Sequence, residues 1–126
     1  MEHAILGVDI AKDSFEAVLL QGELKASCSF SNNRSGFERL SDWLASQGVE
    51  QAYACMEATG RYWEALAYYL REKDHLVSVV NPSRIHHYAK SQLARNKTDG
   101  MDAQIIARFC QKEAPRIWQP LPEELR

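Results

Sequence analysis

The run Ala4–Ile10 is almost entirely apolar, yet it contains one carboxylate, Asp9. An unbroken apolar run of this length is typical of a central strand that is covered on both faces. A charged group in such a strand costs free energy unless a partner compensates its charge. A second carboxylate, Glu57, closes the apolar run Ala52–Met56 in the same way. The two placements predict a common partner for both acids, and a divalent cation is the most economical one.

Two further acids stand three residues apart at the head of an amphipathic segment. Asp99 and Asp102 share a helical stripe with Ile106 and Phe109, at the three- and four-residue spacing that places side chains on one face. The two apolar residues would anchor that face to the sheet, so that both aspartates point toward it. Taken alone, each of the four acids also has an ordinary explanation. Asp9 could belong to a strand-end turn and Glu57 to an exposed surface. Asp99 could interact with the helix dipole, and Asp102 could face solvent. Their joint occurrence favours one shared metal site.

Four converging carboxylates suit one kind of chemistry. Two divalent cations about 4 Å apart activate an attacking oxygen and stabilise a leaving one during phosphoryl transfer. We expect Mg²⁺ as the cofactor, with Mn²⁺ as a substitute, because magnesium prefers oxygen ligands in octahedral geometry. The three cysteines, Cys28, Cys55 and Cys110, form no CxxC pair, so we expect reduced, mostly buried thiols rather than a zinc site or disulfides.

The order of elements predicts an α/β fold with a mixed five-stranded sheet. Three strands are expected at the beginning of the chain, joined by tight turns that make them antiparallel. Two later strands are separated by helices, as parallel crossovers require. Helices would then cover both faces of the sheet. The expected strands span residues 4–10, 15–20, 24–30, 52–56 and 76–80.

Capping residues and periodicity predict the first two helices. Ser35 has capping-box spacing to the glutamate three residues later and would begin a helix that stops near Gly48. A second helix is expected from about Arg61. Thr59 would be its cap, and Tyr62 would lie on its buried stripe.

The last third of the chain predicts two more helices and a tail. A short helix after Asn81-Pro82 is expected to end before Asn96. Thr98 would cap the last helix, and Pro115 would prevent its continuation. We expect residues 1–114 to form one catalytic domain and residues 115–126 to form an extended tail leading toward an absent C-terminal part.

The net charge of −2 gives no overall argument for nucleic acid, but the charge is unevenly distributed. The stretch 75–98 contains no Asp or Glu, and its cations are Arg84, Lys90, Arg95 and Lys97. Because this basic stretch directly precedes Asp99, we predict phosphate contact for it, with a solvated helix face as the ordinary alternative. Lys12, after the first strand, is a further candidate for phosphate contact, and a role in the hairpin turn explains it equally well.

Length and composition predict one soluble domain. A chain of 126 residues is long enough to bury one core of its own. Its start, Met1-Glu2-His3, carries no basic segment, and the apolar run after it is short and contains a charge. We therefore expect no signal peptide, no membrane partner and a cytoplasmic location.

Four short motifs resemble one protein family in their order along the chain. They are G-V-D-I-A-K at 7–12, E-A-T-G-R-Y at 57–62, V-N-P at 80–82 and R-N-K-T-D-G-M-D-A at 95–103. The sequence resembles the DEDD-type transposases of bacterial insertion sequences, a family that also includes the Piv-type site-specific DNA invertases. The family's four acids fall on Asp9, Glu57, Asp99 and Asp102.

The resemblance implies a RuvC-like ribonuclease H fold, Mg²⁺ dependence, and metal-dependent DNA strand cleavage and transfer. It implies DNA and further copies of the chain as partners, and in some members a structured guide RNA. Family members continue into a helical linker and a second domain that carries a serine used in recombination, and no serine here matches that motif. The resemblance therefore predicts an isolated, incomplete catalytic domain of a bacterial protein.

Two other functions remain open on the sequence. The basic stretch also fits a nucleic-acid-binding and dimerisation module without cleavage activity of its own. Half of a sugar-kinase or actin-like ATPase would share the sheet order and an early Asp. The ATPase hypothesis is disfavoured because the sequence lacks a Gly-rich phosphate loop, and 126 residues cannot form the two lobes of such a protein. Cleavage with Mg²⁺, tight RNA binding without cleavage, or ATP turnover would distinguish the three.

Overall fold

Five strands form a single sheet with the order β3-β2-β1-β4-β5. The computed structural model of the chain describes residues 4–96 and 103–122, without the side chains of residues 92–96. The predictions for the Arg95 side chain and for Lys97, Thr98, Asp99 and Asp102 therefore lie outside the described residues. The strands are β1 (Ala4–Ile10), β2 (Ser14–Gln21), β3 (Leu24–Ser31), β4 (Ala52–Glu57) and β5 (Leu76–Val80).

β1 lies at the centre of the sheet, as its apolar sequence predicts. It pairs antiparallel with β2 and parallel with β4. β3 pairs antiparallel with β2, and β5 pairs parallel with β4. The predicted mixed sheet, three antiparallel strands followed by two parallel ones, is therefore confirmed. Because β1, β3, β4 and β5 run in the same direction, their carboxyl ends meet at one edge of the sheet, which we name the carboxyl edge.

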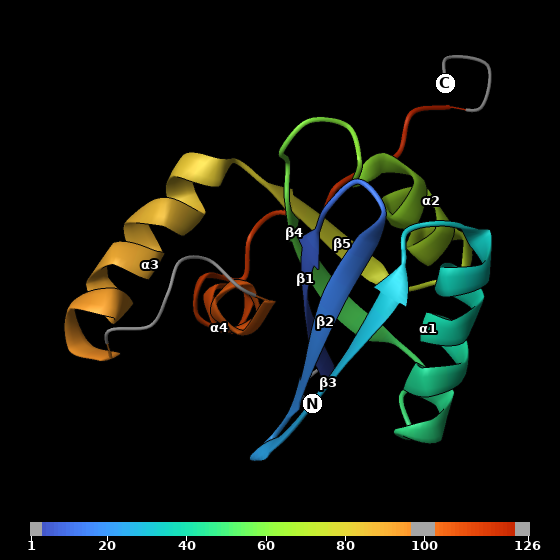
Figure 1. The fold of residues 1–126 in the computed structure, drawn as a ribbon, viewed down its shortest axis with the longest axis horizontal. Helices are drawn as coiled ribbons and strands as arrows, with labels where there is room; N and C mark the ends of the chain where they lie inside the picture. The colour runs from blue at the N-terminus through green and yellow to red at the C-terminus, as the bar shows by residue number, and fades with distance from the viewer. Residues whose placement is uncertain (1–3, 97–102, 123–126) are drawn as a thin grey trace.

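Helices cover both faces of the sheet (Figure 1). α1 (Arg34–Ser46) and α2 (Glu64–Glu72) lie on one face, and α4 (Ala103–Glu113) lies on the other. α3 (Pro82–Asn96) extends away from the sheet and lies beside α4. No helix in the part of the chain that the structure describes is long and apolar enough to cross a membrane.

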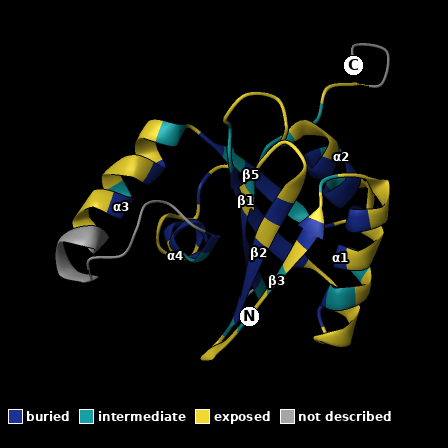
Figure 2. Ribbon diagram, in the orientation of Figure 1, coloured by how far each residue is buried: buried dark blue, intermediate teal, exposed yellow. Residues whose placement is uncertain are grey.

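The sheet separates two hydrophobic clusters. Leu6 of β1 packs with Leu40 and Leu66 in the cluster under α1 and α2. Cys55 of β4 packs with Ile106 in the cluster under α4. Figure 2 shows the central strands and α4 largely buried, whereas much of α3 is exposed. Burial on both faces explains why β1 and β4 contain so few polar residues.

Two helix bounds differ from the predictions. α1 begins at Arg34 and not after Ser35, because Asn33 is the N-cap. The Asn33 Oδ1 atom accepts a hydrogen bond from Gly36 N at 2.9 Å, which satisfies one of the free amides of the first turn. α3 continues to Asn96, so this helix is longer than the sequence predicted.

The start of α2 also differs. The helix begins at Glu64, and the residues before it form turns. Tyr62 therefore precedes the helix and is 46% exposed, which makes its predicted place on the buried stripe wrong. The buried stripe of α2 consists instead of Leu66, Tyr69 and Leu70 together with Ala67.

The segment after α4 docks against β5. Ser78 Oγ of β5 lies 3.0 Å from the carbonyl oxygen of Pro115 and 2.8 Å from that of Arg116. Trp118 N donates to Val77 O at 2.7 Å. The Trp118 ring packs edge-on against aromatic residues of the α2 region, with centroid distances of 5.8 Å to Trp63 and 5.0 Å to Tyr68. Residues 114–122 contain no helix or strand.

Candidate metal and nucleic-acid site

Asp9 and Glu57 are neighbours at the carboxyl edge. The register of the parallel pair aligns Gly7 with Cys55 and Val8 with Met56, and the two acids are the next residues along their strands. Side chains alternate along a strand, so Asp9 shares the face of Gly7 and Glu57 shares the face of Cys55. Both of these neighbours contact the α4 side of the sheet. The structure thus brings these two predicted acids together on one face.

The beginning of α4 lies directly on β1 next to these acids. A Cβ at Gly7 would lie 2.3 Å from Ala103 O and 2.4 Å from Ala107 N, so only glycine permits this approach. Gly7 leaves room close to the sheet, and α4 occupies that room. Asp102 immediately precedes Ala103 in the sequence. Because Asp99 and Asp102 lie outside the described residues, their membership of the site stays a prediction.

Glu57 is held by a residue two positions later. Thr59 Oγ1 donates a hydrogen bond to Glu57 Oε1 at 2.6 Å, and Thr59 N donates to Glu57 O at 2.9 Å. The predicted role of Thr59 as a helix cap is wrong, since α2 begins only at Glu64. The hydroxyl instead restricts the rotation of the carboxylate at the site.

The thiol under these acids stays protonated. The contact with Cys110 and the burial of the side chain both raise the pKa of the Cys55 thiol. Cys55 and Cys110 are buried and Cys28 is half-buried, all as free thiols, in agreement with the prediction. The donors available next to α4 are therefore carboxylate oxygens, which suit Mg²⁺ and Mn²⁺. Within residues 4–96 and 103–122, no group of three or more His, Cys, Asp or Glu side chains is placed to hold a metal ion.

A further carboxylate on this face was not predicted. Glu16 of β2 is the cross-strand partner of Asp9, so it shares the same face. Its signal in the sequence was the alternation in β2, where Ser14 and Glu16 are exposed and Phe15 and Ala17 are buried. The charge of Glu16 increases the negative potential that a cation at this face would neutralise.

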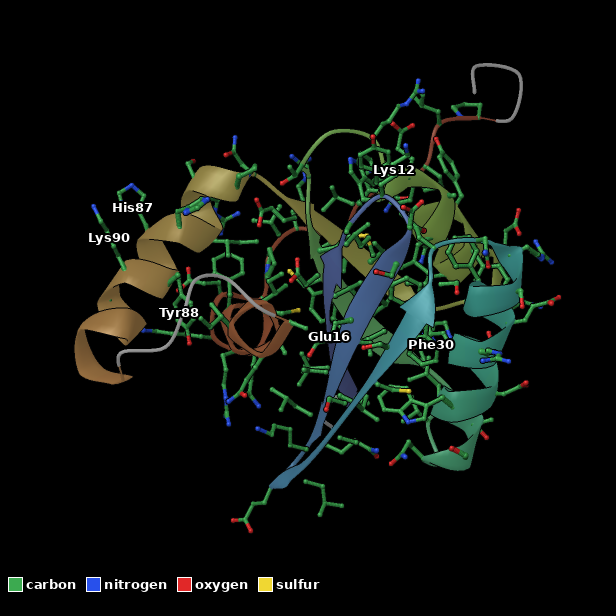
Figure 3. All side chains as sticks on the ribbon, viewed as in Figure 1. Lys12, Glu16, Phe30, His87, Tyr88 and Lys90 are labelled. Carbon is green, nitrogen blue, oxygen red and sulfur yellow. The ribbon has the colours of Figure 1, made fainter. Side chains whose placement is uncertain are left out.

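A basic hollow begins where β5 leads into α3. The hollow has a volume of about 600 Å³ and is lined by Asn81, Pro82, Ser83, His86, His87 and Lys90. Lys90 is thus one predicted phosphate contact that faces a concave surface, and Figure 3 shows Lys90 and His87 pointing away from the sheet. Arg84 lies elsewhere, with its guanidinium carbon 5.3 Å from the centre of the Phe109 ring of α4.

Lys12 lies at the carboxyl edge, in the turn between β1 and β2 (Figure 3). It is exposed and contributes to a second hollow, of about 340 Å³, that is also lined by Asn32, Arg61, Tyr62, Glu64 and Ala65. Arg61 and Tyr62 were not predicted as nucleic-acid contacts. Their only signal in the sequence was their position soon after Glu57 in the motif E-A-T-G-R-Y.

Comparisons with known proteins identify the family. The model of the DEDD transposases of the IS110 type, described as a transposase, matches residues 6–126. Two curated relatives named pilin gene-inverting protein, from Moraxella bovis and Moraxella lacunata, are each 42% identical over 122 residues. The match covers 95% of this chain but only 38% of each relative, so the chain spans well under half of their length.

A solved structure confirms the fold. The T. thermophilus RuvC in complex with Holliday junction substrate matches with a TM-score of 0.54 at 13% sequence identity, over 89% of this chain and 96% of that one. The predicted RuvC-like sheet is therefore present, and the family that the motifs indicated is matched along nearly the whole sequence. The chain belongs to the family of DEDD transposases of the IS110 type, which includes pilin gene-inverting relatives.

Proposed function

We propose that this chain is the catalytic domain of a DNA transposase or recombinase, and that it cleaves and transfers DNA strands with the help of divalent cations. The observation that carries the proposal is the placement of Asp9 and Glu57 as neighbours on one face of the sheet, beside the start of α4. Membership of a transposase family and relatives named for gene inversion support DNA recombination as the process.

Mg²⁺, or Mn²⁺ in its place, is the proposed cofactor. Asp9 and Glu57 would hold it, together with Asp99 and Asp102 from the segment that precedes α4. When bound, divalent cations activate the attacking oxygen and neutralise charge on the phosphate that is cleaved. The oxygen donors at this face fit that group, because magnesium takes carboxylates and keeps several waters.

The chain's own residues prepare this site. Thr59 restricts the Glu57 carboxylate through the 2.6 Å hydrogen bond to Oε1. Gly7 lets the start of α4 approach β1, which places Ala103 beside the strand that carries Asp9. A ligand set whose orientation is fixed before binding loses less conformational entropy when the metal binds.

Basic residues on both sides of the acids are the proposed phosphate contacts. Lys12 is exposed and lines the hollow at the carboxyl edge, and Lys90 is exposed and lines the hollow along the first part of α3. Arg84 contributes less, because its guanidinium packs on Phe109. Arg95 and Lys97 complete the proposed set on the basis of the sequence. The proposed partners are DNA, a structured guide RNA and further copies of the chain.

The first test measures metal binding alone. The melting temperature of the wild-type chain should rise from EDTA to millimolar Mn²⁺, because a ligand that binds the folded state stabilises it by mass action. Asp9→Asn and Glu57→Gln should fold and lose this rise. Glu23→Gln removes an exposed carboxylate in the β2–β3 turn, at the opposite edge of the sheet, and should keep it.

The second test measures cleavage of labelled DNA with Mn²⁺. Cleavage by the wild type and by Glu23→Gln, but not by Asp9→Asn or Glu57→Gln, would support the proposal. An equal metal response in all four proteins would show that the two acids bind no metal. Metal and DNA binding without cleavage would favour the alternative function, a nucleic-acid-binding and dimerisation module that depends on the rest of a longer protein for activity. The 38% coverage of the relatives favours testing for this outcome.

A further inference from the structure

The hollow beside Lys12, which we name the turn hollow, is built by three segments that meet at the carboxyl edge. Its lining comes from the β1–β2 turn, from the residue that follows β3, and from the loop between β4 and α2 together with the first turn of α2. It consists of Lys12, Asn32, Arg61, Tyr62, Glu64 and Ala65. Two of these segments continue directly from the acids of the site. Lys12 follows Asp9 by three residues, and Arg61 follows Glu57 by four.

One side chain holds the walls of the turn hollow together. Asn32 Nδ2 lies 3.0 Å from Ala11 O and 3.4 Å from Lys12 O in the β1–β2 turn. The same nitrogen lies 3.0 Å from Tyr62 O in the loop before α2. A second hydrogen bond, from Trp63 Nε1 to Gly60 O at 3.0 Å, restricts that loop from within. The hollow is therefore formed before any ligand binds, which lowers the entropy cost of binding.

The lining residues have the chemistry of a nucleotide-binding site. Lys12 and Arg61 are exposed cations, which bind phosphate oxygens, and Arg61 can do so with two parallel hydrogen bonds. Tyr62 exposes 46% of its surface, and aromatic rings at such places stack on unpaired bases. Glu64, in the first turn of α2, is the one lining residue whose charge opposes phosphate among those that the structure describes there.

The volume of the turn hollow favours a single strand over a duplex as its ligand. At about 340 Å³ it is near the lower end of ligand pockets, which suits one nucleotide and not a duplex. A base must leave its helix before it can stack on a side chain, so an exposed Tyr62 in a small hollow favours a single strand.

We propose that the turn hollow binds one nucleotide of a single strand that crosses the carboxyl edge next to Asp9 and Glu57. Lys12 and Arg61 bind its phosphates, and Tyr62 stacks on its base. This inference rests on the proposed function and specifies its substrate: the strand is unpaired beside the phosphate that is cleaved.

Fluorescence anisotropy in EDTA measures nucleic-acid binding by the turn hollow without metal. The probes are a labelled DNA oligonucleotide of about 12 nucleotides, the RNA of the same sequence, and the DNA duplex. The wild type should bind a single strand more tightly than the duplex. Tyr62→Ala should weaken single-strand binding at least about fivefold, the lower limit for one lost stacking contact, and Tyr62→Phe should restore it. The double variant Lys12→Gln/Arg61→Gln should lower the salt slope by about 1.4, and Glu64→Gln should strengthen binding.

Matched controls separate this result from the metal site. Arg39→Gln removes an exposed cation from α1 and should leave binding unchanged. The melting temperature of each variant shows that it folds, and the Mn²⁺ response at Asp9 and Glu57 is measured separately, so either proposal can fail alone. Tighter binding of DNA supports the proposal, whereas tighter binding of RNA would overturn the placement of the cleaved DNA strand in the turn hollow. Wild-type affinity in Tyr62→Ala and in the double variant, or a preference for duplex, would overturn the proposal.

Discussion

The orientation of Glu57 depends on one hydroxyl group. Thr59 Oγ1 donates to the carboxylate at 2.6 Å, a charge-assisted hydrogen bond. Thr59→Val keeps the side-chain shape but removes the donor, so Glu57 becomes free to rotate. We expect the Mn²⁺ affinity to fall by about ten- to a hundredfold, which is typical of a lost partner of a metal ligand. Calorimetric titration measures this change, and Thr59→Ser should recover most of the affinity. Wild-type affinity in Thr59→Val would limit the hydroxyl to a role in the loop.

Gly7 determines how closely α4 packs on β1. Gly7→Ala would place its Cβ 2.3 Å from Ala103 O, so the helix has to move. We expect the free energy of unfolding to fall by about 1–3 kcal/mol or more, the usual cost of overpacking, and the Mn²⁺ response to weaken with it.

Urea unfolding measures the cost at Gly7, and Gly22→Asn is the control. Gly22 also has a backbone that favours glycine, with φ of 58°, but no atom of the described residues lies within 4 Å of a Cβ there. Asn tolerates this left-handed conformation, so the control should cost little. Equal stability of Gly7→Ala and the wild type would contradict the close packing of α4.

The tail after α4 stabilises the sheet through Trp118. Its ring packs against Trp63 and Tyr68, and its amide extends the hydrogen bonding of β5. The ring is half-buried, so we expect Trp118→Ala to lower the free energy of unfolding by about 1–3 kcal/mol, less than for a fully buried ring. Leu121→Ala, at a position that is 53% exposed, should cost little in the same unfolding experiment. Equal stability of Trp118→Ala, Leu121→Ala and the wild type would show that the Trp118 ring contributes nothing to the fold.

Strands were easier to predict than helix starts. β5 (Leu76–Val80) has the predicted bounds. A short apolar run between turn residues is typical of a strand that is covered on both faces of the sheet. The start of α1 was predicted from the capping-box spacing of Ser35, but Asn33, two residues earlier, is also a residue type that caps helices well. The hydrogen bond from Gly36 N to Asn33 Oδ1 makes Asn33 the cap, and this contact cannot be read from the sequence. The prediction for Tyr62 was wrong for a related reason. Its spacing fits the apolar stripe of α2, but the helix begins only at Glu64.

The candidate site was predictable only where strand geometry alone determines it. The apolar runs that end near Asp9 and Glu57 predicted both acids at strand ends, and the register between β1 and β4 makes them neighbours. Glu16 needed the register between β1 and β2, and Arg61 and Tyr62 needed the hollow that folding creates beside Lys12. These features depend on contacts between distant segments, which a single sequence does not specify.

The whole molecule places exposed cations in two separate hollows. Lys12 lies in the turn hollow at the carboxyl edge, and Lys90 lies in the hollow along α3, which we name the α3 hollow, while Arg84 packs on Phe109. This division predicts different salt dependences for DNA binding. Lys90→Gln removes an exposed cation that lines the α3 hollow, so the slope of binding against salt should fall by about 0.9, the value for one phosphate contact in a duplex. Arg84→Gln should change the slope less but lower the free energy of unfolding by about 0.5–1 kcal/mol, because it loses the contact with Phe109.

Anisotropy titrations of a DNA duplex at several salt concentrations, paired with urea unfolding of each variant, measure both quantities. Arg39→Gln on α1 should change neither, since that cation is exposed on the other side of the sheet. A common slope for wild type, Lys90→Gln and Arg39→Gln would assign the α3 hollow to ordinary solvated surface. The reverse pattern, with the larger loss of slope in Arg84→Gln, would mean that the guanidinium leaves Phe109 to reach phosphate when DNA binds.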